Sequence, residues 1–495
     1  MMVAESVQTE TSAAQGSVLL IGCFVFTALV NYAFAILMSW LLPVHEFGIV
    51  GVAQAVMLLG GTVMSAGFPW ALTRHVAALP GEESTRAATR LALIGNVLVG
   101  LAFGGVVYGV TARGSGEFGE YGQVMLLAAA TVEMLAVSSV FVAALRGVLR
   151  FRAAAIVLSI EVVVKLLVSG ALVLLGQGAV GAVAGFVAGA AVSALVALVA
   201  AGGVPLRAHT DGRGLGELNS SVTPLFVSMC GLAALLYGDT IGVKLFSPAA
   251  NSDEVAGYYQ AAVTLSRIPV FVTIALCGVI FSYLARYRAA RNQPLTTYYA
   301  SSLVRYATLF IIPINLVLMV IPDQVIRTFY SAKYDASAQP LRFAALGAIM
   351  LVFVQVFTTM LQTTDSLRWA MIVLPAAVAV EIGALAVLVP LYGAVGAGLA
   401  VAVAGAFALC FLAPLAIRVY NLRLSARGKL ATPLTLAVPA AALYLLPHGG
   451  RVTTVLTVLV AGALYVATLI AVNQLQGRDF AILASGFGRD KSYLS

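Results

Sequence analysis

The chain has 495 residues, of which 61% are hydrophobic and only 10% are charged, and its mean hydropathy is +1.00. In a soluble protein, charged residues make up about a quarter of the chain. Here the apolar residues fall into runs of about 20 or more, the length that an α-helix needs to cross roughly 30 Å of hydrocarbon. The composition excludes a soluble globular fold and predicts an all-α polytopic membrane protein.

The net charge of +8 does not indicate a nucleic-acid partner. A nucleic-acid-binding protein gathers its basic residues on one solvated face. In this chain Arg and Lys stand singly or in threes at the ends of apolar runs, so the expected partner is the lipid bilayer. The four cysteines all lie inside apolar runs and form no CxxC pair, so we expect no disulfide, metal or cofactor. They are Cys23, Cys230, Cys277 and Cys410.

Hydropathy predicts about fourteen transmembrane helices joined by short turns. The first apolar run has no basic residue before it and is as long as the later ones, which favours a retained helix over a cleavable signal. The thirteenth is short and contains Pro433 and Pro439. In chain order the predicted spans are 17–42, 47–72, 88–111, 123–145, 153–175, 179–203, 221–246, 257–284, 300–322, 339–361, 369–391, 393–417, 431–447 and 452–474.

The distribution of basic residues between loops predicts the orientation of the chain. Loops after even-numbered spans, together with the C-terminal tail, carry nineteen Arg and Lys residues, whereas loops after odd-numbered spans carry four. Cytoplasmic loops are enriched in Arg and Lys. We therefore expect both termini in the cytoplasm of a cell-membrane protein.

An internal repeat is visible in the sequence. FVAALRGVLRFRAAAIVL (141–158) aligns with FTTMLQTTDSLRWAMIVL (357–374), and Gly178-Ala-Val-Gly181 aligns with Gly393-Ala-Val-Gly396. Because each repeat contains an even number of helices, the two halves should be related by a pseudo-two-fold axis along the membrane normal. The predicted organisation is an N-terminal tail (1–16), two six-helix bundles (17–220 and 221–417), two additional helices (418–474) and a C-terminal tail (475–495).

Nine charged residues lie within the predicted spans. A charge at the centre of a bilayer costs about 2.5–3.5 kcal/mol, so each deep one needs a partner or a role. Two of them, Arg305 and Arg342, are close enough to a span end to extend toward the interface. The other seven are Glu133, Glu161, Lys165, Asp239, Lys244, Arg267 and Glu381.

Asp239 and Arg267 form the strongest constellation among these residues. Asp239 lies about 10 Å below the outer end of the seventh span and Arg267 about 15 Å into the eighth, so an ion pair across the hairpin fits the geometry. The pair could fix helix register, or Arg267 could hold an anionic headgroup whose binding Asp239 tunes. Lys244 lies near the outer end of its span.

The remaining deep charges have weaker assignments. Glu161 and Lys165 are spaced i, i+4 and either neutralise each other or contribute to a substrate site. Glu133 and Glu381 have no partner close in sequence and are candidates for cation coupling. Tyrosines at the span ends, such as Tyr287 and Tyr298-Tyr299, are typical interfacial anchors.

Several segments in order resemble the polysaccharide-transporter branch of the multidrug/oligosaccharidyl-lipid/polysaccharide (MOP) flippase superfamily. They are Asn31-Tyr32 with LLPVHEFGIVGVAQAV (41–56), EVAGYYQAAVTLSRIPVF (254–271), FYSAKYDASAQPLRFAALG (329–347) and LYGAVGAGLA (391–400). The resemblance implies two six-helix bundles around a central cavity, alternating access, and oligosaccharides on a polyprenyl pyrophosphate carrier as substrates. This sequence departs from two related groups. Lipid II flippases carry cationic residues in the first two spans, where this chain has none. Drug–cation antiporters often have an acidic residue in the first span, where this chain has Asn31.

The sequence thus predicts a non-enzymatic flippase that moves a lipid-linked oligosaccharide from the cytoplasmic to the outer leaflet. The expected substrate-site residues are Arg267, Asp239, Lys165, Glu161 and Lys244, with Arg267 first because a guanidinium is a fixed charge suited to phosphate. Membrane glycosyltransferases or a glycan polymerase are expected partners. The alternatives are a cation-coupled multidrug exporter, a lipid II flippase, a membrane-embedded glycan polymerase or ligase, and a scaffold. No nucleotide-binding motif is present.

Overall fold

A computed structural model describes residues 2–78, 82–114, 120–202, 214–422, 426–446 and 450–472, with side chains for most of them. Every described element is a helix. In chain order they are α1(Met2–Leu41), α2(Val44–Ala66), α3(Phe68–Ala78), α4(Glu82–Gly114), α5(Glu120–Gly147), α6(Phe151–Leu174), α7(Gly178–Ala200), α8(Gly214–Phe246), α9(Ser252–Ser266), α10(Ile268–Ala289), α11(Gln293–Val320), α12(Pro322–Phe329), the 3-10 helix η1(Ala332–Ser337), α13(Ala338–Leu361), α14(Leu367–Tyr392), α15(Ala394–Tyr420), α16(Ala426–Leu445) and α17(Arg451–Ala471).

Thirteen stretches of the described residues are long and apolar enough to cross a membrane. They correspond to the predicted spans with the exception of the thirteenth, where the described apolar part of α16, Thr435–Leu445, is too short. The helix that contains the first span begins at Met2, so the predicted N-terminal tail continues it. The predicted C-terminal tail, 475–495, lies outside the described residues.

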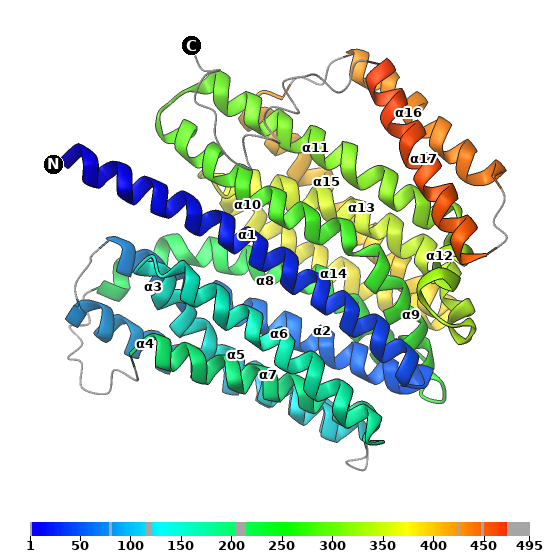
Figure 1. The fold of residues 1–495 in the computed structure, drawn as a ribbon, viewed down its shortest axis with the longest axis horizontal. Helices are drawn as coiled ribbons and strands as arrows, with labels where there is room; N and C mark the ends of the chain where they lie inside the picture. The colour runs from blue at the N-terminus through cyan, green and yellow to red at the C-terminus, as the bar shows by residue number, and fades with distance from the viewer. Residues whose placement is uncertain are drawn as a thin grey trace.

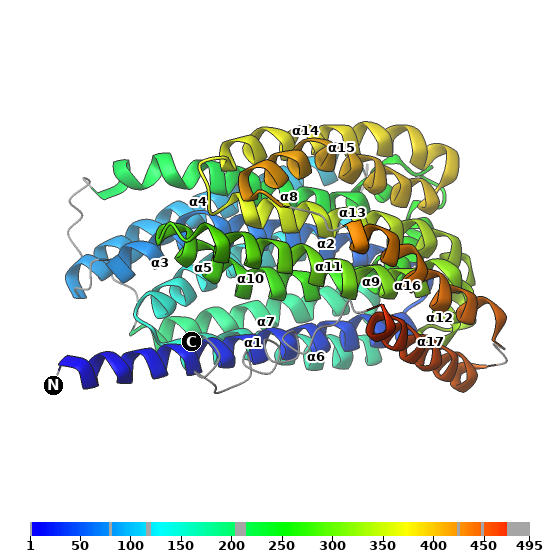
Figure 2. The same ribbon diagram turned by 90° about the horizontal axis from the view of Figure 1, so that it is seen from above.

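The helices form one bundle with the chain's two halves side by side (Figures 1 and 2). In the first half α6 and α5 pack on α7, and α4 packs on α5. In the second half α15 packs on α13 and α14, and α14 packs on α8. The hairpin of α16 and α17 lies outside this bundle against α11 and α12, where the hydroxyl of Tyr465 donates to the carbonyl of Leu309 at 2.9 Å.

Two aligned glycines of the repeat occupy equivalent positions in the two halves. Gly178 opens α7 with a φ of 52°, and Gly393 precedes α15 with a φ of 56°. Both conformations lie in the left-handed region that glycine adopts without a steric penalty. The following glycines of the motif, Gly181 and Gly396, approach the preceding helix so closely that a Cβ would lie 3.2 Å from the backbone of Leu172 and 2.1 Å from that of Leu388. These matched turns support the duplication seen in the sequence.

The prediction of continuous helices for the second and eighth spans was wrong. The second is divided at Gly67 into α2 and α3, and the eighth is divided at Arg267 into α9 and α10. Proline follows two residues after each break, as Pro69 and Pro269. Proline has no N–H to donate and its ring clashes with the preceding turn, which interrupts the helical hydrogen bonds. The broken helices are the second of each repeat.

The two halves meet most closely where α2 crosses α9, near the predicted outer end of both helices. A Cβ on Gly48 would lie 2.0 Å from the carbonyl oxygen of Asp253, and one on Gly257 would lie 2.1 Å from that of Val44. Beside this crossing the indole of Trp40 donates to the carbonyl of Phe329 at 3.1 Å, and the ammonium of Lys333 donates to that of Leu42 at 2.6 Å. These contacts close the predicted outer end of the interface between the halves.

Candidate functional site

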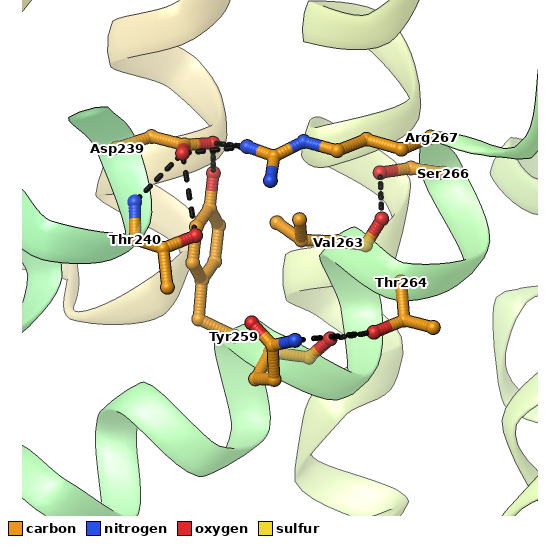
Figure 3. Close-up of polar contacts among 8 residues, drawn as sticks. Asp239, Thr240, Tyr259, Val263, Thr264, Ser266 and Arg267 are labelled. Atoms are coloured by element: carbon orange, nitrogen blue, oxygen red, sulfur yellow. Dashed lines mark hydrogen bonds and ion pairs between the residues drawn. The ribbon is translucent and has the colours of Figure 1, made fainter. Parts of the chain in front are cut away.

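Asp239 and Arg267 form a direct, buried ion pair between α8 and the junction of α9 with α10 (Figure 3). One terminal nitrogen of the guanidinium, Nη2, lies 2.6 Å from Oδ1 and 2.7 Å from Oδ2 of Asp239. Asp239 is 2% exposed and Arg267 is 8% exposed. The pairing expected from the sequence is therefore present, and both charges are removed from bulk solvent.

Asp239 accepts further hydrogen bonds besides those from Arg267. The hydroxyl of Tyr259, on α9, donates to Oδ2 at 2.7 Å, and the backbone N–H of Thr240 donates to Oδ1 at 2.7 Å (Figure 3). A buried carboxylate needs several donors to replace the water it has lost. Because of these two donors, Asp239 would not be left without partners if Arg267 moved away.

Arg267 lies at the point where the eighth span is broken, and its surroundings come from both halves. Its guanidinium lies 5.5 Å from the ring centroid of Tyr237 on α8. Tyr32 of α1, in the first half, interacts electrostatically with Arg267 and packs its ring edge-on against Phe271 of α10 at 6.3 Å. The hydroxyl of Tyr32 is buried without a hydrogen-bond partner. Arg267 is thus a cation at the interface between the halves.

Glu381 joins this cluster from α14, although nothing close to it in sequence is charged. It is buried, interacts electrostatically with Asp239 and Arg267, and has one carboxyl oxygen, Oε1, without a hydrogen-bond partner. The cluster therefore contains two carboxyl groups and one guanidinium. Within the described part of the chain, no three His, Cys, Asp or Glu side chains are grouped so that they could hold a metal ion.

A cavity of about 10 Å³ borders the ion pair between α8, α9, α13 and α15. Its lining includes Asp239, Tyr259, Arg267, Ala344 and Val401. A cavity of this size has room for about one water molecule. In this conformation the space next to the pair does not admit a sugar or a pyrophosphate group.

Lys165 and Glu161 lie on α6 in a separate cluster in the first half. The ammonium of Lys165 donates to the side-chain oxygen of Asn31 on α1, and it lies 5.0 Å from the ring centroid of Phe34 and 4.7 Å from that of Phe186. Glu161 interacts electrostatically with Lys165 and accepts a long hydrogen bond from Ser193 at 3.4 Å. The two residues are close, as their spacing predicts, but the hydrogen bond of Lys165 goes to Asn31.

Three glycines spaced by four on α7, Gly181, Gly185 and Gly189, explain how Glu161 and Lys165 become buried. A Cβ on Gly189 would lie 2.6 Å from the carbonyl oxygen of Glu161, and one on Gly185 would lie 2.5 Å from the backbone nitrogen of Ser169. Small residues spaced by four let two helices approach closely within a membrane. The glycine spacing therefore brings α7 against the face of α6 that carries Glu161 and Lys165.

The last two candidate residues lie apart from both clusters. Lys244 forms a salt bridge with Asp253 at 2.5 Å, donates to Ser252 at 2.9 Å, and lies 4.7 Å from the ring centroid of Tyr121. Lys244 therefore links the end of α8 to the start of α9, on the predicted outer side of the membrane. Glu133 packs against Gly100 of α4, and its Oε2 has no hydrogen-bond partner.

Sequence reasoning missed two contributions to these clusters that had detectable signals. Tyr259 precedes Arg267 by two helical turns, a spacing that places both on one face of a helix and could have marked Tyr259 as a partner of Asp239. Asn31 is a polar side chain near the middle of the first span and could have been matched with a buried lysine. The position of Glu381 beside Asp239 depends on how α14 packs on α8, and no local pattern reports that.

The helices define a class, the multi-pass membrane proteins, and their arrangement is similar to that of solved transporters of the MOP superfamily. The lipid II flippase MurJ in an inward closed conformation is similar with a TM-score of 0.71 at 15% identity, over 92% of this chain and 99% of that chain. An inward-facing multidrug resistance MATE family transporter of the MOP superfamily gives 0.64 at 15% identity, over 82% and 99%. A MOP superfamily transporter from Pyrococcus furiosus gives 0.61 at 15% identity, over 83% and 95%. At such identities the likeness shows the fold alone.

The family is shown by the sequence itself. The profile of the polysaccharide biosynthesis protein family matches residues 13–288, more than half of the chain. The chain belongs to this family, as the resemblance of its segments predicted. A search of the curated proteins finds no match. The family match and the described apolar helices agree on a multi-pass membrane protein.

Proposed function

We propose that the protein moves a polyprenyl-pyrophosphate-linked oligosaccharide from the inner to the outer leaflet of the cytoplasmic membrane by alternating access. The observation that carries this proposal is the buried Asp239–Arg267 pair at the interface between the halves of a polysaccharide-family chain. A glycan and a pyrophosphate are too polar to cross hydrocarbon unaided and need a partly cationic passage. The polyprenyl tail can stay in the lipid.

Arg267 is the proposed anchor for the pyrophosphate. A guanidinium presents a fork of N–H donors that matches phosphate oxygens, and it stays charged in the membrane. When the halves separate, the pyrophosphate would replace Asp239 as the acceptor for Arg267. Asp239 would keep its hydrogen bonds from Tyr259 and Thr240, which lowers the cost of the exchange.

Glu381 gives this exchange a place for cation coupling. With Arg267 engaged by substrate, Asp239 and Glu381 would remain as two neighbouring carboxyl groups, which together attract a cation. An inside-negative membrane potential also favours export of the anionic headgroup, by about 2.3 kcal/mol per charge per 100 mV. This scheme assigns no direct contact with the headgroup to the candidate residues outside the Arg267 cluster, which are Glu133, Lys165, Glu161 and Lys244.

The direction of transport rests on the predicted topology, in which both termini are cytoplasmic. Glycosyltransferases would deliver the substrate at the inner face, and a membrane glycan polymerase would receive it outside. We propose no catalytic role for the chain itself, and the similarity of its fold to those of solved transporters supports this proposal.

A neutral double variant tests the role of Arg267 in transport. Removing one member of a buried ion pair costs about 3–5 kcal/mol, whereas replacing both with neutral groups is often tolerated. Asp239→Asn with Arg267→Gln should therefore fold. In proteoliposomes it should flip a fluorescent polyprenyl-pyrophosphate oligosaccharide at least tenfold more slowly than the wild type, because the pyrophosphate has lost its cation.

The single variant Arg267→Gln is the comparison, because it removes the same cation but leaves Asp239 charged and should therefore be less stable than the double variant. A loss of flipping in both variants, with normal folding of the double variant, assigns the loss to transport. If the double variant folds and flips the lipid at the wild-type rate, the pair serves only to hold the helices together. A labelled cationic drug is the second substrate in the same vesicles. Efflux of the drug in place of the lipid would instead establish the multidrug exporter.

A further inference from the structure

Four tyrosines gather at the predicted cytoplasmic end of the α10–α11 hairpin. The rings of Tyr283 and Tyr299 are parallel to within 1° with centroids 4.9 Å apart, and those of Tyr287 and Tyr299 to within 12° at 5.3 Å. Tyr298 meets Tyr299 edge-on at 5.5 Å. Tyr283 is 42% exposed and Tyr298 is 43% exposed. We call these four residues the tyrosine platform.

The geometry of the platform differs from that of an interfacial anchor. A tyrosine anchor buries its ring among lipid tails and directs its hydroxyl to the headgroups, and it needs no aromatic neighbour. In the platform the rings stack on one another in a fixed arrangement, so little conformational freedom remains to be lost when a ligand binds. An ordered aromatic surface that stays partly exposed fits the apolar face of a sugar ring.

Three arginines lie on the same hairpin as the platform, near the C-terminal end of α10. Arg286 and Arg291 are exposed at the end of α10, and Arg288 lies 5.9 Å from the ring centroid of Tyr420 on α15. Arg291 has a φ of 54°, in the left-handed region that non-glycine residues rarely adopt. The sequence contains no Asp or Glu between Glu254 and Asp323.

The charge balance of this end is therefore basic. Thr297 at the start of α11 donates to the carbonyl of Tyr420 at 3.0 Å, and the hydroxyl of Tyr420 donates to that of Met360 at 2.7 Å, so α15 and the end of α13 pack beside this hairpin. The turn that follows α13 carries Asp365. The arginines of the hairpin itself are complementary to an anion. A ligand that carries both sugar rings and phosphates matches the platform and its arginines together.

We propose that the tyrosine platform and its arginines dock the glycan and pyrophosphate of the lipid-linked substrate in the cytoplasmic leaflet, before the headgroup reaches Arg267. This inference rests on the proposed function and adds a first binding site to it. The platform stands at one end of α10, and Arg267 directly precedes the other end of the same helix. Docking here would place the headgroup beside the helix that leads to the central pair.

The test uses the full chain in proteoliposomes with a polyprenyl-pyrophosphate trisaccharide as the probe. Tyr283→Leu with Tyr298→Leu keeps apolar side chains at the interface and removes the two exposed rings of the platform. We expect the half-saturating mole fraction of the probe to rise about threefold to tenfold, because stacking contributes roughly 0.5–1.5 kcal/mol per ring. The maximal rate should change less than twofold. The matched control is Tyr392→Leu, an exposed tyrosine that ends α14 on the predicted outer side.

A second probe, polyprenyl pyrophosphate without sugars, separates the two parts of the site. The tyrosine variant should leave its half-saturation unchanged, whereas Arg286→Gln with Arg291→Gln should raise it. The inference is overturned if half-saturation for the trisaccharide lipid is unaltered, if Tyr392→Leu alters it equally, or if the variant lowers only the maximal rate. It is also overturned if phosphatidylglycerol competes as well as the probe, which would make the surface a general site for anionic lipids. If the wild type flips neither probe, the proposed function itself fails.

Discussion

Among the residues that the structure describes, each half has one cation that is almost fully buried, and the two are held in different ways. Lys165 lies in the unbroken helix α6 and contacts Asn31, Phe34 and Phe186, all from the first half. Arg267 lies at the break between α9 and α10, is bound by a carboxylate, and faces Tyr32 of the other half. Both cations take their hydrogen-bond acceptor from their own half, but only Arg267 also faces a residue of the other half, Tyr32.

This difference shows why helix continuity matters as much as charge. A cation inside one rigid bundle can stabilise that bundle, but it meets a substrate only if the bundle itself opens. A cation at a helix break, between halves that meet at the α2–α9 crossing, would become exposed if the halves moved relative to each other. The position of Arg267 therefore suits headgroup binding better than that of Lys165, although both are buried in this conformation.

The largest expected effect comes from removing the carboxylate of the Arg267 cluster. Asp239→Ala leaves a buried guanidinium without its acceptor, and we expect a loss of about 3–5 kcal/mol in stability. Arg267→Ala should cost less, because Asp239 keeps the donors of Tyr259 and Thr240. Thermal unfolding of the two purified variants in the same detergent measures the order. Equal losses would mean that these two donors do not support the carboxylate in the absence of Arg267.

A smaller effect is expected at the crossing that joins the halves. Gly257→Ala puts a Cβ within 2.1 Å of the carbonyl oxygen of Val44, so α2 and α9 must separate. Overpacking of this kind costs about 1–3 kcal/mol. We expect wider separation between spin labels at the exposed positions His45 and Glu254, measured by electron paramagnetic resonance after the native cysteines are replaced.

The matched control for this substitution is Gly278→Ala on α10. A Cβ on Gly278 has no neighbour within 4 Å, so the added methyl group should leave the label separation unchanged. If Gly257→Ala also leaves it unchanged, the crossing tolerates side chains and is not the tight closure of the outer end.

Most of the membrane-spanning helices could be predicted from the sequence, but the positions at which two of them are interrupted could not. Apolar run length predicted thirteen of the spans that the described residues contain, and the Gly178 and Gly393 motifs predicted matching turns. Continuous helices were predicted through Pro69 and Pro269, because hydropathy averages over a proline. A proline that interrupts backbone hydrogen bonds leaves the length of an apolar run unchanged.

In the candidate site, the pair of Asp239 and Arg267 could be predicted from the sequence, but the place of Glu381 beside it could not. The Asp239–Arg267 pair followed from helix rise alone, since two charges at comparable depth on adjacent helices find each other. Glu381 was assigned no partner because its neighbour comes from α8, more than a hundred residues earlier in the chain. The small size of the cavity beside the pair also depends on how α13 and α15 pack, which no single helix encodes.

The smallest expected effect comes from neutralising the cation of the first half. Lys165→Met keeps an unbranched, polarisable side chain against Phe34 and Phe186, while it removes both the ammonium and the cost of burying it. Loss of the cation–π contacts and of the bond to Asn31 is offset in part by that relief, so stability should change by about 1 kcal/mol or less. Flipping of the lipid-linked oligosaccharide should fall less than threefold, well short of the tenfold expected for the neutral Arg267 variant. Glu161→Gln is the companion variant, because it removes the nearby charge and leaves the contacts of Lys165 with Asn31, Phe34 and Phe186 in place. If Lys165→Met slows flipping as strongly as the Arg267 variant while Glu161→Gln does not, Lys165 binds the headgroup, and the distinction between a stabilising and an exchanging cation is wrong.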